Sequence, residues 1–210
     1  MQIKALSLGM LGVNCYLIST NEAAIVIDPA NLDKRIKDFL IENKEKERLI
    51  LLTHCHFDHI GGANALRERY NTKIAIGENE ASSLLDTNMT LSSRFHAHIE
   101  PFSADILLKD GEIFKFADLE ILCIETKGHT KGGMCYKIGD ALFSGDTLFK
   151  RSVGRVDFLG GNTKELMSSL SKITEMFEDI DVYPGHGEAT TLNSERKCNP
   201  FLQPDGEFLL

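Results

Sequence analysis

Residues 53–59 read Thr-His-Cys-His-Phe-Asp-His, and they follow the apolar run Leu-Ile-Leu-Leu at 49–52. A continuous apolar run of this kind is typical of a strand that is buried on both faces. The segment at 60–66 brings two glycines and then a stretch where a helix can begin. The sequence therefore predicts that three imidazoles and one carboxylate crowd the end of a buried strand.

The spacing of these four side chains predicts two neighbouring metal sites. His54 and His56 are two residues apart, so on extended backbone they point the same way and can bind one ion together. Asp58 and His59 lie past the bend, at the expected helix start, and should point elsewhere. The alternative is a helix-capping Asp58 beside solvated histidines, but four such residues within six positions favour metal binding. Cys55 should point away from the site and pack in the core.

The composition is that of an ordinary globular protein. The 210 residues suit one large domain or two small ones. The formal net charge of -8 argues against nucleic acid as a partner, because phosphate binding needs a positive surface. No apolar run approaches the roughly 20 residues that span a bilayer, and the N-terminus lacks a signal-peptide layout. The five cysteines are scattered without CxxC pairs, so we expect a cytoplasmic protein without disulfides or membrane contact.

The apolar pattern of the first half predicts alternating strands and helices. Strands are expected at 3–8, 15–19, 23–28, 49–52 and 73–76, and helices at 33–46, 63–70 and 78–85. In the second half, 106–143 has the glycine punctuation of an antiparallel meander, followed by a helix at 165–177 and a final strand at 181–183. Each half runs strands and then a helix. We therefore predict one α/β domain, residues 1–210, with four layers built from two similar halves.

Three more polar residues follow apolar strands and stand beside glycine. His129 lies in Gly-His-Thr, Asp146 in Ser-Gly-Asp-Thr and His186 in Gly-His-Gly. Glycine lets the backbone turn sharply and come close to a bound group. Each residue taken singly has another explanation, such as a capping carboxylate or a hydrogen-bonded histidine. Together with the first cluster they complete two coordination spheres.

Other polar residues leave alternatives open. Asp28 ends the strand at 23–28, and it either shapes a turn or orients a ligand histidine. His96 and His98 resemble the metal pair in spacing, but no apolar strand precedes them. We interpret them as surface residues.

These motifs carry a family resemblance that covers residues 1 to about 201. The sequence resembles metallo-β-lactamase-fold hydrolases, and among them the glyoxalase II branch, with Thr-His-x-His-x-Asp-His at 53–59, Gly-His-Thr at 128–130, Ser-Gly-Asp-Thr-Leu-Phe at 144–149 and Gly-His-Gly at 185–187. The resemblance implies an αβ/βα sandwich. It implies a first metal held by His54, His56 and His129, and a second held by Asp58, His59 and His186. It also implies that Asp146 bridges both ions.

The sequence departs from that branch at two places. The resemblance would include a helical C-terminal domain that helps to bind glutathione, and the chain stops before it. The loop at 154–158 keeps a basic residue, Arg155, but not the family's tyrosine. Arg155 either meets a substrate carboxylate or pairs with Asp157. The best-known lactamases place cysteine at the position of Asp146, which disfavours antibiotic hydrolysis.

The ligand set predicts a hydrolase that uses two divalent metal ions, most simply zinc, with iron or manganese also suited to these ligands. Two ions lower the pKa of a shared water towards about 7, with Asp58 and Asp146 as the catalytic carboxylates. No separate general acid stands out, and a thiolate leaving group needs none. We therefore expect a small-molecule thioester as substrate and hydroxyacylglutathione hydrolase chemistry. The alternatives are a persulfide dioxygenase with one iron, or a metal- or thiol-conjugate-binding protein without turnover. The sequence leaves the oligomeric state undetermined.

Overall fold

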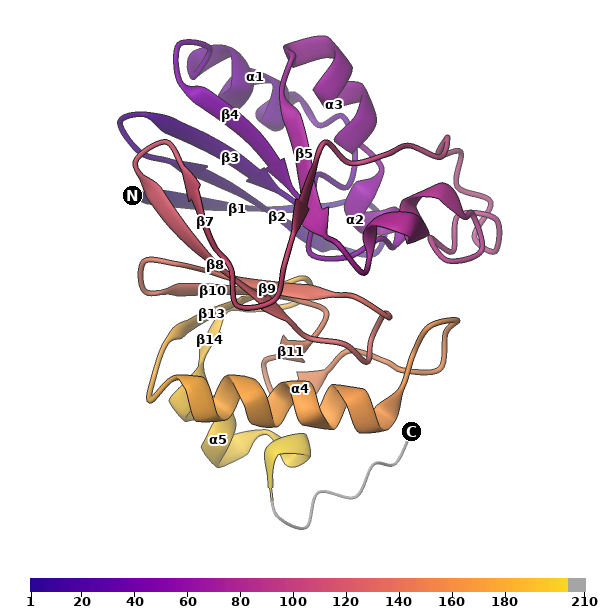
Figure 1. Ribbon diagram of the computed structural model, residues 1–210, viewed down its shortest axis with the longest axis vertical. Coiled ribbons are helices and arrows are strands. Elements are labelled where there is room, and N and C mark those ends of the chain that lie inside the picture. The colour runs from indigo at the N-terminus through magenta and orange to yellow at the C-terminus, as the bar shows by residue number, and fades with distance from the viewer. Residues whose placement is uncertain (204–210) are drawn as a thin grey trace.

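Two six-stranded sheets face each other at the centre of the molecule, and helices cover their outer faces (Figure 1). The computed structural model describes residues 1–203. The first sheet has the order β1-β2-β3-β4-β5-β6, with β1 Gln2–Leu8, β2 Val13–Ser19, β3 Ala23–Ile27, β4 Glu47–Leu51, β5 Lys73–Gly77 and β6 Ile106–Leu108. Its helices are α1 (Lys34–Glu42), the single turn α2 (Phe57–Ile60) and α3 (Ala63–Tyr70).

The second sheet has the order β14-β13-β10-β9-β8-β7. Its strands are β7 Ile113–Phe116, β8 Leu119–Glu125, β9 Met134–Ile138, β10 Ala141–Gly145, β13 Asp181–Pro184 and β14 Thr190–Thr191. Helices α4 (Thr163–Met176) and α5 (Leu192–Cys198) lie against its outer face (Figure 1). A two-stranded ribbon, β11 (Leu148–Phe149) with β12 (Ser152–Val153), and two 3₁₀ turns, η1 (Ala81–Leu85) and η2 (Pro200–Leu202), complete the fold. The predicted four-layer αβ/βα sandwich is confirmed.

The continuous apolar runs are explained by burial on both faces of the sheets. In β4, Leu49 and Leu51 enter the core between the sheets. Ile50, and Leu52 directly after the strand, enter the core beneath α1 and α3. A third apolar cluster lies between the second sheet and α4 and α5. Each fully buried leucine or isoleucine contributes about 2 kcal/mol relative to exposure. The continuous apolar runs in the sequence therefore correspond to strands that are covered on both faces.

Because neighbouring strands run in the same direction, the polar segments that follow them lie at one common edge of the two sheets. Strands β3, β4 and β5 run parallel, as do β10 and β13. Two tyrosines join the sheets beside that edge. Tyr16 of β2 donates a hydrogen bond to the Pro184 carbonyl at 2.6 Å, and Tyr136 of β9 donates one to the Leu52 carbonyl at 2.7 Å. The ends of strands from both halves are thereby held together.

Several element boundaries differ from the sequence expectation. The helix expected at 33–46 ends at Glu42, where Asn43 caps it with its backbone N–H on the Phe39 carbonyl. The helix expected at 78–85 is the shorter η1, because Glu80 turns inward. The meander expected from 106 begins only at β7, since β6 pairs in parallel with β5 and completes the first sheet. Strand β13 is not the last, because β14 adds to its open edge.

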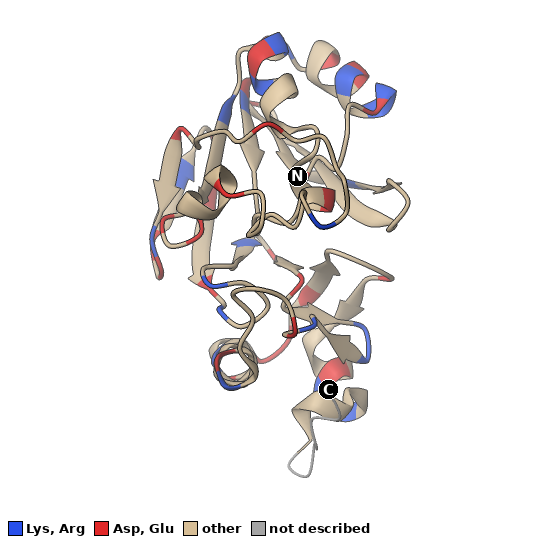
Figure 2. Ribbon diagram, turned by 90° about the vertical axis from the view of Figure 1, so that its right-hand side faces the viewer, with Lys and Arg blue, Asp and Glu red and all other residues tan. Residues whose placement is uncertain are grey.

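The described part of the chain, 1–203, has no helix with the length and apolarity to cross a membrane. The outer helices carry both basic and acidic residues (Figure 2). The predicted single domain of residues 1–210 includes residues 204–210, which lie outside the described residues.

Candidate metal centre

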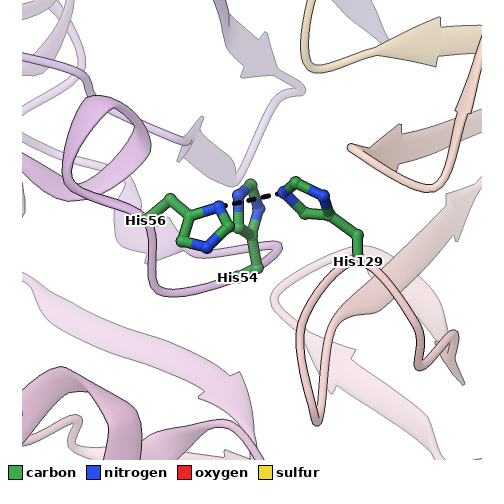
Figure 3. Close-up of side chains that lie close together, drawn as sticks. All are labelled: His54, His56 and His129. Atoms are coloured by element: carbon green, nitrogen blue, oxygen red, sulfur yellow. Dashed lines mark hydrogen bonds between the residues drawn. The ribbon is translucent and has the colours of Figure 1, made fainter. Parts of the chain in front are cut away.

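Three histidines from both halves meet at the edge where the sheets join. His54 and His56 follow β4, and His129 follows β8. One nitrogen from each ring lies within 4.8 Å of the others. His56 Nδ1 is 2.9 Å from His129 Nε2. Figure 3 marks this contact with a dashed line. Because 73 residues separate these two rings, only the packing of the two halves creates this group.

A second group lies beside the first and consists of Asp58, His59 and His186. The one-turn helix α2 presents the first two, and the loop after β13 presents His186. His59 Nε2 is 3.3 Å from His186 Nε2, and Asp58 Oδ2 is 3.4 Å from the same His186 nitrogen. Asp58 and His59 thus group with His186, although the His59 ring also lies close to His54, with ring centroids 4.1 Å apart.

Asp146 lies between the two groups. Its Oδ2 is 3.5 Å from His129 Nε2 and 3.6 Å from His186 Nε2, and its Oδ1 is 3.5 Å from His59 Nε2. Asp146 Oδ1 accepts no hydrogen bond although it is buried. The carboxylate therefore faces donor atoms of both groups at once.

Hydrogen-bond partners define the protonation of four of the five rings. The Nδ1 atoms of His129 and His186 face the carbonyls of Arg155 and Leu11, which can only accept. His59 Nδ1 likewise faces Asp28 Oδ2. His54 Nδ1 lies 3.0 Å from Thr53 Oγ1, whose proton goes to Asp28. Assigned from these partners, each Nδ1 carries the proton and each Nε2 turns a lone pair to the centre.

These lone pairs require a cation. His54 Nε2 is buried and has no hydrogen-bond partner, and the Nε2 atoms of His59 and His186 lie 3.3 Å apart. In His56 it is Nδ1 that faces the group, 2.9 Å from His129 Nε2. Neutral imidazoles and carboxylates are ligands for zinc, iron and manganese. The donor set, the orphaned buried atoms and the intermediate position of Asp146 fit a dinuclear metal site.

Asp28 and Thr53 orient His54 and His59, one histidine from each metal group. Asp28 accepts hydrogen bonds from the Thr53 backbone N–H at 2.8 Å and from Thr53 Oγ1 at 2.6 Å, and its Oδ2 is 2.9 Å from His59 Nδ1. Its φ of 49° lies in the left-handed region, which aspartate enters more readily than most residues. Of the two roles left open for Asp28, the orienting one is therefore the one that the structure supports.

Glycine next to His186 is required by close approach. A Cβ on Gly185 would lie 2.2 Å from Asp146 Oδ1 and 2.8 Å from the His59 ring. Any larger residue at this position would displace a side chain of the centre. The glycine in the Gly-His-Gly motif thus has a packing reason.

Burial and the carboxylates set the charges of the centre. Burial lowers the pKa of His54 and His56 well below the usual range, so both stay neutral. Burial alone would also lower the pKa of His59, but Asp146 and Asp28 outweigh it and raise this pKa to about 10. Burial would raise the pKa of Asp58, but His186 and His59 lower it to about 2. Without a metal ion His59 would therefore hold a second proton, on Nε2, and a metal ion bound by this nitrogen would take the place of that proton.

Glu80 is a buried residue of the centre that the sequence analysis missed. Its Oε1 accepts the Cys55 backbone N–H at 3.0 Å, and its Oε2 accepts the Gly132 backbone N–H at 2.8 Å. One carboxylate thus ties the loop of His54 and His56 to the loop that carries His129. No pattern in the sequence around Glu80 indicates this role, because its two partners are backbone groups from distant segments.

The other candidate residues from the sequence lie outside the two metal groups. Cys55 is buried in the core beneath the helices and does not face the metal ligands, as expected. His96 and His98 are exposed and belong to none of the metal-binding groups within 1–203. Arg155 forms a bidentate ion pair with Asp157, with both contacts at 2.6 Å, and its backbone carbonyl accepts from His129.

A cavity of about 420 Å³ opens over both groups. Its wall combines residues of the metal groups with apolar side chains, and its lining is Leu11, His56, Phe57, Asp58, Leu91, Phe95, His129, Asp146, Phe149, Val153, Arg155, Phe158 and His186. Among these described residues there is no lysine or tyrosine. The cavity therefore offers few groups that can supply a proton to a leaving group.

Two facing sheets with such a His/Asp centre at their common edge define the class of metal-dependent hydrolases. The chain belongs to the metallo-beta-lactamase superfamily, whose family model matches residues 8–186.

Similarity to individual proteins extends over nearly the whole chain. The chain is 31% identical to "Probable metallo-hydrolase YqgX" of Bacillus subtilis, with 96% of this chain and 98% of that protein covered. It is 32% identical to hydroxyacylglutathione hydrolase GloC of Haemophilus influenzae, with coverage of 96% and 98%.

Two crystal structures are similar at comparable identity. BLEG-1, described as a B3 metallo-beta-lactamase, superposes with a TM-score of 0.85 at 32% identity, covering 96% of this chain and 99% of that one. TTHA1623 in a di-iron-bound form gives a TM-score of 0.82 at 30% identity, with coverage of 95% and 100%. The descriptions of these proteins differ: one is a probable metallo-hydrolase, one a hydroxyacylglutathione hydrolase, one a B3 metallo-beta-lactamase and one a di-iron-bound protein.

Proposed function

We propose that this chain is a dinuclear metal-dependent thioester hydrolase of the hydroxyacylglutathione hydrolase type. The observation that carries the proposal is the position of Asp146 between two groups of ligands whose lone pairs turn inward. We assign His54, His56 and His129 to one ion, Asp58, His59 and His186 to the other, and Asp146 to both. The similarity to GloC supports the substrate class.

The proposed reaction adds water to a thioester and yields a carboxylic acid and a thiol. Two bound divalent ions would lower the pKa of a water from about 15.7 towards about 7. Asp58, whose pKa of about 2 keeps it ionised, can accept a hydrogen bond from that water and orient it. Asp28 and Thr53 hold the histidines in place while the carbonyl of the substrate approaches.

The surroundings of the centre favour thioesters over esters and amides. A thiol with a pKa of about 8.5 leaves as a thiolate at neutral pH, whereas an alkoxide or amine needs a proton during departure. The cavity lining supplies neither lysine nor tyrosine for that purpose among the described residues. We therefore propose a small-molecule thioester as the substrate.

The test is thiol release from S-lactoylglutathione by the full chain loaded separately with zinc, iron or manganese. Matched oxygen esters and a cephalosporin serve as comparison substrates, the latter because BLEG-1 is described as a lactamase. We expect kcat/KM for the thioester to exceed that for either comparison substrate by at least about 100-fold. Preferred cephalosporin hydrolysis, oxygen uptake with a persulfide by a one-iron protein, or metal binding without turnover on the panel would each overturn the proposal.

A further inference from the structure

A second cavity, of about 450 Å³, adjoins the cavity over the metal groups. The two share Leu11, Phe57, Asp58 and Phe95 in their walls, so they adjoin along these residues, and we refer to both together as the groove. We call the cavity over the metal groups the proximal chamber and the second one the distal chamber. The distal chamber lies between the β1–β2 turn, the segment around α2 and residues 97–99.

The distal chamber has an apolar lining. Leu8, Ala30, Ala97 and Ile99 face it, and Asp58 and His98 are its only ionisable residues within 1–203. At its rim, Met10 is fully exposed and Leu11 is 54% exposed. An apolar cavity with exposed apolar side chains at its rim is suited to an apolar ligand.

A row of three aromatic rings runs along the groove. Phe57 and Phe95 are stacked, with ring centroids 5.0 Å apart and an interplanar angle of 23°. Phe95 meets Phe158 edge-on at 6.1 Å. Phe158 lines only the proximal chamber, whereas the other two rings line both. The rings thus form a continuous wall from one chamber into the other.

The end of the groove at Phe158 carries positive charge. The guanidinium of Arg155 lies 4.0 Å from the Phe158 ring centroid, and that of Arg94 lies 5.1 Å from it. Asp157 is paired with Arg155, which lines the proximal chamber. Arg94 lies outside that lining and forms no ion pair within 4.0 Å among the described residues, although its charge also helps to lower the pKa of Asp157. Two guanidiniums and one carboxylate leave one positive charge. The groove therefore has a positively charged end at Phe158, the metal groups in the proximal chamber, and an apolar end in the distal chamber.

We propose that the acyl group of the substrate is an apolar chain that lies in the distal chamber, while an anionic thiol carrier lies towards Arg94. This inference rests on the proposed thioester hydrolysis. Water supplies oxygen to the acyl carbon, the carbon–sulfur bond breaks, and the carrier leaves with the electron pair and is protonated to the thiol. A carrier that bears carboxylates or phosphates fits the guanidinium end, so the acyl group is left with the apolar one.

The first experiment measures kcat/KM on glutathione thioesters with lactoyl, acetyl, butanoyl, hexanoyl and octanoyl groups. The full chain carries zinc. Burial of each methylene is expected to raise kcat/KM about fourfold until the chamber is filled. A flat or falling profile from acetyl to octanoyl would overturn the inference, even if all the thioesters are hydrolysed.

Variants locate the chain-length effect in the distal chamber. Ala97 faces only this chamber, and Ala97→Glu places a charge in it; we expect the octanoyl-to-acetyl ratio to fall at least about tenfold. Met10→Asp, at a fully exposed position that folding does not require, is expected to lower the ratio about threefold. Ala5→Glu, at an exposed position of β1, is the matched control and should leave the octanoyl-to-acetyl ratio unchanged. Unchanged ratios in both chamber variants would contradict the assignment.

A binding measurement separates this inference from the proposed function. S-octylglutathione and S-methylglutathione are thioethers that cannot be hydrolysed, so calorimetry on the zinc-loaded chain measures binding without turnover, and the difference between the two compounds reports the alkyl group. We expect the octyl compound to bind at least about 100-fold more tightly, and Ala97→Glu to remove the difference. Equal affinities would refute the chamber assignment. Absence of thioester turnover together with the expected affinities would refute only the hydrolase.

Discussion

Asp28 Oδ2 lies 2.9 Å from His59 Nδ1 and accepts the hydroxyl proton of Thr53, which in turn contacts His54 Nδ1. One buried carboxylate therefore orients a histidine from each of the two metal groups. A carboxylate that accepts a hydrogen bond from a ligand histidine fixes the orientation of that ring and raises its basicity as a ligand.

Replacing Asp28 by Asn is expected to weaken metal binding about 10- to 100-fold. All three partner groups donate to Asp28, and an amide nitrogen would face one of them as a competing donor. Competition with a chromogenic chelator measures the affinity. Asp38→Asn on α1 changes an exposed carboxylate in the same way and should have no effect. Equal affinities of Asp28→Asn and the parent chain would contradict the orienting role.

Glu80→Gln should destabilise the fold by about 1–3 kcal/mol, because one of two backbone N–H groups loses its buried acceptor. The midpoint of urea unfolding with constant slope measures the change. Because Glu80 joins the loops of His54, His56 and His129, metal affinity should fall as well. Glu78→Gln, two residues earlier and exposed, is the control. If Glu80→Gln kept the stability and the metal affinity of the parent chain, Glu80 would not be needed to hold the two ligand loops together.

Asp146→Asn is expected to reduce bound metal from about two ions per chain to about one or fewer. The carboxylate lies between both groups, and an amide can ligate through only one oxygen. Mass spectrometry of the folded protein gives the stoichiometry. Asp140→Asn, in the exposed turn before β10, should retain two ions. Two tightly bound ions in the Asp146 variant would show that bridging is dispensable.

Cys198 should be the one thiol that reacts rapidly with iodoacetamide in the folded protein. Burial raises the pKa of Cys15 and Cys55 well above the usual range, that of Cys123 to about 12 and that of Cys135 to about 11. Cys198 is exposed. Peptide mapping after timed labelling identifies the modified residue. The control is Cys198→Ser, which should remove the fast phase of labelling. Rapid labelling of Cys55 would contradict the prediction and show that the segment between His54 and His56 opens.

Local sequence was sufficient for the parts of the site that are adjacent in the chain. The two-residue spacing of His54 and His56, and the bend before Asp58 and His59, predicted that these pairs point to different places, because side-chain direction follows from local backbone geometry. The layering also followed from the sequence, since runs such as 49–52 are apolar on both faces of a strand.

Pairings over long separations could not be predicted from local pattern. The apolar triplet of β6 has no feature that assigns it to β5 and not to β7, and its partner depends on which sheet edge is open. The role of Glu80 was equally invisible, because a carboxylate that accepts backbone N–H groups leaves no matching residue types in the sequence.

The sequence by itself determined the layered α/β architecture and the identity of the seven candidate ligands, because both depend on residue type and local spacing. Only the tertiary structure decided that Asp146 faces both groups, that Asp28 and Glu80 hold the ligand loops, and that Phe57, Phe95 and Phe158 form one wall. These relationships join segments far apart in the chain. They exist only after the two sheets have packed against each other and brought their strand ends to a common edge.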